Sequence, residues 1–159
     1  MRKTERFYQM LLQYEALPHS SSNKSEFFFK MMGKARSFSD WTAVYQYAGS
    51  SIRKDAQHKM EETVLKGTNR KAIQMNIHEL FMICNKADMD KILERYLRKY
   101  KEKDDYLFAI CEADWGYSDL MPDWIEKVQN EFGVVSLSQE LAARHEATRE
   151  MMKKSKFKP

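Results

Sequence analysis

The sequence predicts an all-α protein of eight or nine helices. Five glycines and three prolines in 159 residues are far fewer than turn-rich β proteins or disordered chains contain. Apolar residues recur three and four positions apart along most of the chain, which is the helical period, and no segment keeps the apolar-polar alternation of an exposed strand. Helices of three to four turns with short links favour antiparallel pairs. We therefore expect a short α-solenoid or an irregular helical bundle.

Four helices are predicted in the first part of the chain. Pro18 stops the first helix, and Gly49 follows the third. Ser25 can cap the second helix, and Ser37 or Ser39 can cap the third. The predicted ranges are 3–17, 25–36, 41–48 and 51–66.

Five further helices are predicted after residue 67. Asn85 is a reasonable end for the first of them, Pro122 suits a first helical turn, and Gly133 follows the end of the same helix. Ser136 and Gln139 have the spacing of a capping box for the last helix. The predicted ranges are 69–84, 87–101, about 104–114, 122–132, and from 136 into the C-terminal residues.

One local pattern recurs at intervals of roughly thirty residues, which is typical of stacked helical pairs. It is a lysine followed by an apolar residue, with an acid three or four positions upstream. The four instances are Lys30-Met31, Lys59-Met60, Lys91-Ile92 and Lys127-Val128. An acid four positions before a lysine also stabilises any single helix, so an irregular bundle predicts the same pattern.

Residues 37–60 resemble the short α-α repeats of the HEAT-like and TPR-like solenoid families. The residues that carry the resemblance are Ser37-Phe38-Ser39-Asp40-Trp41, Val44-Tyr45 and His58-Lys59-Met60. The resemblance implies repeats over about residues 25–132, stacked into a curved array that offers a concave surface to another macromolecule.

The length fits one domain with its own core. We expect this domain to span residues 1–152 and a basic tail to follow at 153–159. No run approaches the roughly 20 apolar residues of a membrane span, and the N-terminal residues lack the apolar stretch of a secretory signal. Two cysteines do not make a disulfide framework. The expected location is therefore the cytoplasm, with no membrane partner.

The charges are unevenly distributed along the chain. Residues 1–103 hold twenty Lys and Arg against twelve Asp and Glu, whereas residues 104–135 hold one lysine against eight acids. Such asymmetry can steer a charged partner, and it can equally attract neighbouring segments to each other inside one fold.

No arrangement of residues predicts an enzyme, a metal site or a cofactor. The four histidines are too dispersed to supply a pair of metal ligands. The sequence contains no nucleophile motif, phosphate-binding glycine loop or dinucleotide fingerprint. Several acids of the 104–135 segment stand at predicted helix starts, where carboxylates complement the helix dipole. We therefore expect a non-enzymatic binding protein without a small-molecule substrate.

The leading functional expectation is an adaptor or a regulatory or inhibitory protein that binds another protein. Acids and large aromatic residues are interleaved in the 104–124 segment, and aromatic anchors ringed by polar groups are favoured at protein interfaces. This acidic-aromatic surface would steer a partner with a basic surface and then bury one or two rings, although the tryptophans could equally lie in the core. The expected site residues are Asp105, Glu112, Asp114, Trp115, Tyr117 and Asp119.

The alternative is a small helical subunit that contacts nucleic acid. Arg95, Arg98 and Lys99 are three and four positions apart, so they share one face of a helix. Such a face could neutralise phosphates. Glu94 and Glu102 dilute the positive charge, so an ordinary solvated helix face fits the same pattern. The candidate residues are Arg95, Arg98, Lys99, Lys101 and Lys103.

Overall fold

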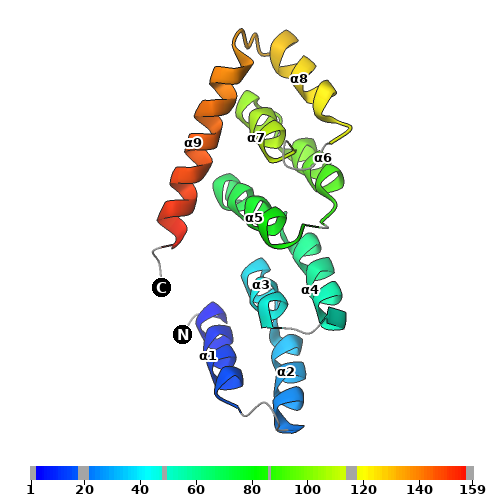
Figure 1. Cartoon of the computed structure of the whole chain (residues 1–159), viewed down its shortest axis with the longest axis vertical. Helices are drawn as coiled ribbons and strands as arrows, with labels where there is room; N and C mark the ends of the chain where they lie inside the picture. Colours follow the sequence, from blue (N-terminus) through cyan, green and yellow to red (C-terminus); the bar gives the residue numbers. More distant parts are fainter. Residues whose placement is uncertain (1–2, 18–21, 48–49, 86, 114–117, 157–159) are drawn as a thin grey trace. The chain divides into compact units, whose positions relative to one another are not determined.

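The computed structural model describes residues 3–17, 22–47, 50–85, 87–113 and 118–156 (Figure 1). These residues form nine α-helices and contain no strand, which confirms the all-α prediction. The chain divides into two compact units, Met1–Lys66 and Gly67–Pro159, here called unit 1 and unit 2. This division into units does not test whether residues 1–152 form one domain, so that expectation stays a prediction.

Unit 1 contains four helices, and the spacing of their apolar residues explains how they pack. They are α1 (Lys3–Ala16), α2 (Ser22–Lys34), α3 (Phe38–Tyr47) and α4 (Ser50–Thr63). The neighbouring helices α3 and α4 pack together, in agreement with the expected pairing of helices, and α1 packs against α2 and α3. The core of the unit is made of buried apolar residues at helical spacing: Phe7, Leu11, Phe28, Met31, Ala35, Phe38, Trp41, Val44, Ala56, Met60 and Val64.

A capping box begins α3. The hydroxyl oxygen of Ser37 accepts a hydrogen bond from the backbone N–H of Asp40 at 3.1 Å. In return, Asp40 Oδ2 accepts from the backbone N–H groups of Ser37 at 3.2 Å and of Arg36 at 3.0 Å. Ser37 is therefore the cap, and Ser39 is exposed.

Unit 2 contains five helices arranged around α7. They are α5 (Arg70–Ile83), α6 (Met89–Lys99), α7 (Lys103–Ala113), α8 (Met121–Asn130) and α9 (Leu137–Lys156). The central helix α7 packs against α5, α6, α8 and α9, and every residue from Leu107 to Ala113 is buried. The neighbouring helices α7 and α8 pack together, whereas α5 packs mainly on α7 and α9 and meets α6 through the hydrogen bond from Gln74 to Tyr96.

Local capping fixes the helix ends in unit 2. The side chain of Asn69 caps α5 and that of Asp88 caps α6, each by accepting a backbone N–H of the first turn. Pro122 lies in the first turn of α8, as predicted. Gly133 adopts a left-handed conformation with φ of 67°, and Val134 N–H then donates back to Val128 O at 3.0 Å. The last helix continues through Lys156, so the first residues of the expected tail are helical.

Candidate functional site

Helix α6 separates apolar and basic residues sharply. Its buried side comprises Ile92, Leu93, Tyr96 and Leu97, which point into unit 2. The opposite side and the two residues after the helix carry five exposed cations, and we call this surface the α6 basic face: Lys91, Arg95, Arg98, Lys99 and Lys101. Lys103, the remaining cation predicted for this site, is exposed at the start of α7. The structure thus brings the predicted basic residues together.

The cations of the α6 basic face differ in their partners. Arg98 Nη2 lies 3.1 Å from Glu94 Oε1, and Lys99 Nζ donates to Gly67 O at 3.4 Å. Among the described residues, the side chains of Lys91, Arg95 and Lys101 form no ion pair. Their charges are balanced by solvent ions, which an anionic partner can replace.

A shallow groove of about 320 Å³ adjoins the basic face between α6, α7 and α8. Leu97, Tyr106 and Trp124 form its apolar lining, Arg98, Lys101 and Lys127 add cations, and Glu94 and Asp123 add carboxylates. The ammonium of Lys127 lies 2.8 Å from Glu131 and 5.7 Å from the centre of the Tyr106 ring, so its charge is already partly compensated, although the side chain is 36% exposed. The groove is therefore mixed in charge and partly occupied by its own side chains.

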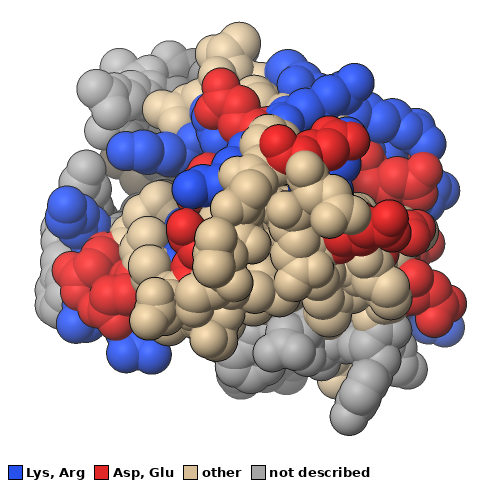
Figure 2. Space-filling model, turned by 90° about the horizontal axis from the view of Figure 1, so that it is seen from above, with Lys and Arg blue, Asp and Glu red and all other residues tan. Residues whose placement is uncertain are grey.

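One face of the molecule is mixed in charge as well. Figure 2 shows Lys and Arg side chains interspersed with Asp and Glu on the face seen from above, without a broad area of one sign. Attraction of a polyanion by this protein thus depends on individual cations that lack a nearby carboxylate.

The acidic residues predicted to bind a protein lie in different environments. Asp105 is 0% exposed and Glu112 is 3% exposed, so neither carboxylate is available at the surface. Asp119 is exposed just before α8. Asp114, Trp115 and Tyr117 lie outside the described residues. The described part of the chain thus retains one exposed member of the expected acidic-aromatic surface.

Asp105 is the centre of a buried polar cluster in unit 2. Its carboxylate accepts hydrogen bonds from Arg70 Nε at 2.7 Å, from the Tyr96 hydroxyl at 2.6 Å and from the backbone N–H of Glu102 at 3.0 Å. Burial and the bond to Asp105 raise the pKa of Tyr96. Burial alone would lower the pKa of Arg70, but Glu102 and Asp105 raise it above its ordinary value.

The cluster continues to α9 through two residues that the sequence did not single out. Gln74 Nε2 donates to the Tyr96 hydroxyl at 2.8 Å, and Gln74 Oε1 accepts from Arg144 Nη2 at 2.6 Å. Arg144 Nε lies 3.2 Å from Asp104 Oδ1 in a geometry that makes an ion pair but no hydrogen bond. Arg144 is only 5% exposed, so these contacts hold a nearly buried guanidinium.

The buried Glu112 of α7 pairs with the partly buried His78 of α5. Its two carboxylate oxygens lie 2.8 and 3.0 Å from His78 Nδ1. When His78 is protonated, this contact is a charge-assisted hydrogen bond. The bond to Glu112 raises the pKa of His78, although partial burial opposes the shift. Burial raises the pKa of the neighbouring Glu79.

The described residues meet the requirements of neither a metal site nor a membrane-spanning helix. Nowhere in the described ranges do three His, Cys, Asp or Glu residues gather closely enough to hold a metal ion. Over the same residues no helix has both the length and the apolar character needed to cross a bilayer. Cys84 and Cys111 are both buried.

Neither a protein-family model, a curated protein nor a solved structure matches this chain. The comparisons thus do not identify a HEAT-like or TPR-like repeat in this chain. The structure supports the all-helical architecture alone.

Proposed function

We propose that this protein is a non-catalytic binding protein that contacts nucleic acid through the α6 basic face. The observation that supports this proposal is the exposure of five cations on one side of α6 and just after it, three of them without an ion pair among the described residues. The apolar side of the same helix is buried, which holds the basic side outward.

The length of the basic face suits a row of phosphates. Lys91 and Lys99 are eight residues apart, which corresponds to about 12 Å along a helix axis. Duplex DNA carries one charge per roughly 1.7 Å of its axis, so a face of this length can meet several phosphates. Each phosphate contact releases a condensed counterion, and this release favours binding most strongly at low salt.

The acidic-aromatic surface has less support as the binding site. Asp105 and Glu112 are buried and paired within unit 2, and they would have to leave these partners to meet another protein. The basic face needs no such rearrangement, because its cations are already exposed.

The test is binding of the purified full chain to fluorescent 20-nucleotide single strands and duplexes over a range of salt concentrations. The variant Arg95→Glu with Lys101→Glu removes two of the cations that have no ion pair among the described residues, so it should bind weakly, and its plot of log K against log salt should be less steep by about 1.5, as expected for two lost phosphate contacts. The matched control is Lys54→Glu with Lys66→Glu, which changes the net charge equally at two exposed lysines of unit 1. This control should keep most of the affinity and most of the slope.

Three results would contradict the proposal. The first is absence of binding by the unaltered chain at low salt. The second is an equal loss of affinity in the two double variants. The third is an affinity that does not change with salt concentration. In a separate pulldown from cell lysate, a protein partner that is retained after nuclease treatment and lost with the Arg95→Glu and Lys101→Glu changes would assign the basic face to protein recognition instead.

A further inference from the structure

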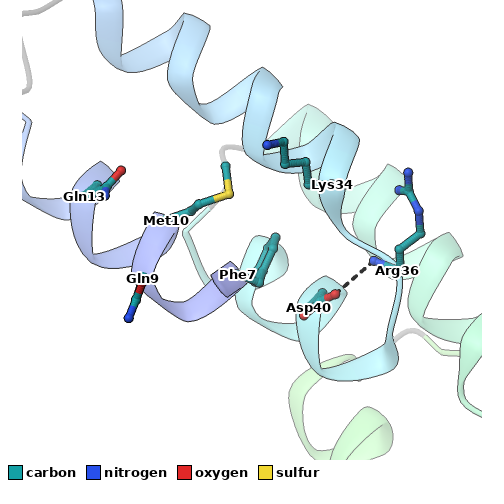
Figure 3. Close-up of a pocket in the computed structure, with 7 residues that line it drawn as sticks. All are labelled: Phe7, Gln9, Met10, Gln13, Lys34, Arg36 and Asp40. Atoms are coloured by element: carbon teal, nitrogen blue, oxygen red, sulfur yellow. Dashed lines mark hydrogen bonds between the residues drawn. The ribbon is translucent and has the colours of Figure 1, made fainter. Parts of the chain in front are cut away.

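A cavity of about 480 Å³ opens in unit 1 between α1, the end of α2 and the start of α3 (Figure 3). Cavities of this size are within the range that binds small organic molecules. The cavity belongs to unit 1, whereas the α6 basic face belongs to unit 2, so the two features are independent.

One part of the cavity lining is apolar and comes from α1. Phe7 is 5% exposed and Met10 is partly exposed, and both side chains point toward the end of α2 that carries Lys34 in Figure 3. Gln13, one turn after Met10 on the same helix, adds an amide to the lining. An apolar chain lying against Phe7 and Met10 would be removed from water, which favours its binding.

The other part of the lining is positively charged. Lys34 is exposed and makes no ion pair with any described residue. Arg36 is held in place because its Nη1 donates to Gly33 O at 2.9 Å and to Ala35 O at 2.8 Å. In Figure 3 the side chain of Arg36 extends away from Phe7 and Met10, so it contributes positive charge at the edge of the cavity.

Asp40 is the one carboxylate in the lining, and the start of α3 compensates its charge. Its Oδ2 accepts the backbone N–H groups of Arg36 and Ser37, and it lies at the positive end of the α3 dipole. The lining therefore combines two cations with one carboxylate that already has partners. A ligand with a single negative charge would balance the remaining positive charge.

We infer that this cavity binds a small amphipathic monocarboxylate, with its apolar part against Phe7 and Met10 and its carboxylate near Lys34. The molecule is bound as a ligand and is not transformed. Lys34 can give the carboxylate a charge-assisted hydrogen bond, which is stronger than a neutral one, and Arg36 adds positive charge at the edge of the same lining. A cationic ligand of the same shape would be repelled by the positive charge of the lining and should bind more weakly.

The test compares octanoate with octylammonium, which share an apolar chain and differ in the sign of their charge. Each is titrated into the full chain below its micelle concentration, and binding is followed by calorimetry and by NMR shifts of the methyl groups of methionines. Octanoate should bind saturably and perturb Met10, and octylammonium should bind at least about tenfold more weakly, as loss of a charge-assisted bond predicts.

Two variants then locate the carboxylate. Lys34→Gln removes the cation from the lining and should weaken octanoate binding about tenfold. Lys30→Gln is the matched control, because Lys30 is exposed one turn earlier on α2 and does not line the cavity. The inference is overturned by equal effects of the two variants, by equal or tighter binding of octylammonium, or by the absence of saturable octanoate binding.

Discussion

The hydroxyl of Tyr96 donates a 2.6 Å hydrogen bond to Asp105, a carboxylate with no exposed surface. This bond joins α6 to α7, and the same hydroxyl accepts from Gln74 of α5. Gln74 in turn accepts from Arg144 of α9, while Arg70 of α5 donates to Asp105. One continuous chain of hydrogen bonds thus connects four helices of unit 2, each through a side chain that is buried or nearly so.

Removal of the Tyr96 hydroxyl should destabilise the protein. Tyr96→Phe keeps the ring, which packs edge-on against Phe108, and deletes both hydrogen bonds of the hydroxyl. Because Gln74 Nε2 and Asp105 each lose a buried partner, the free energy of unfolding should fall by about 2 kcal/mol, measured by urea denaturation. Tyr100→Phe is the control, since that ring lies 5.0 Å from Tyr96 and its hydroxyl has no hydrogen bond within the described structure. A loss as large in the control would rule out this account.

Asp104 and Asp105 are adjacent in sequence and should respond differently to neutralisation. Asp105→Asn leaves Arg70 facing an uncharged group and places an amide N–H₂ among three donors, so it should cost about 3–5 kcal/mol. Asp104→Asn should cost less, about 1–2 kcal/mol, because the Asp104 side chain is 53% exposed and Arg144 keeps its hydrogen bonds to Gln74 and Thr148. Urea denaturation of both variants at one pH compares them directly. Similar losses at the two positions would contradict the role of burial.

The His78–Glu112 pair should make stability depend on pH. The hydrogen bond to Glu112 raises the pKa of His78 in the folded state above its ordinary value of 6.5. The stabilisation from this pair is therefore complete below about pH 6.5 and is lost as the pH rises through the folded-state pKa. His78→Gln should remove this dependence, so the difference in unfolding free energy between the two proteins should shrink from mildly acidic to alkaline pH.

The control for the histidine prediction is His58→Gln on α4. His58 also lies next to a glutamate, with Nε2 2.9 Å from Glu62 Oε1, but its side chain is 70% exposed. Solvent weakens such a pair, so this variant should keep the pH profile of the unaltered protein. If His58→Gln removes the pH dependence of the unfolding free energy and His78→Gln does not, the assignment of this dependence to the His78–Glu112 pair is wrong.

The parts of the fold that sequence predicted well are those that local spacing decides. In α6, Ile92, Leu93, Tyr96 and Leu97 fall three and four positions apart, and this pattern alone places the cations of that helix on the exposed side. Helix ends were similarly predictable at Pro122 and Gly133, whose backbone preferences act within a few residues.

The position of the acidic residues could not be obtained from local chemistry in the same way. Asp105 stands in the first turn of α7, where an exposed acid complements the helix dipole, and its burial depends on Arg70, 35 residues earlier. One signal was present: Asp105, Phe108 and Glu112 fall on one helical stripe, at positions i, i+3 and i+7. Polar residues on an apolar stripe require buried partners, and identifying those partners requires the fold.

The capping box of α3 provides the last prediction, and it concerns unit 1. Ser37→Ala removes the hydroxyl oxygen that accepts the Asp40 N–H, so the start of α3 loses a backbone partner. The expected cost is about 1 kcal/mol, and hydrogen exchange of the α3 amides should accelerate about fivefold while amides of α7 in unit 2 are unchanged. Ser39→Ala is the matched control, because Ser39 is exposed in the first turn of the same helix and its side chain makes no hydrogen bond with other described residues. Equal acceleration in the two variants would show that Ser37 does not act as the cap, because the two serines differ in the bond to Asp40.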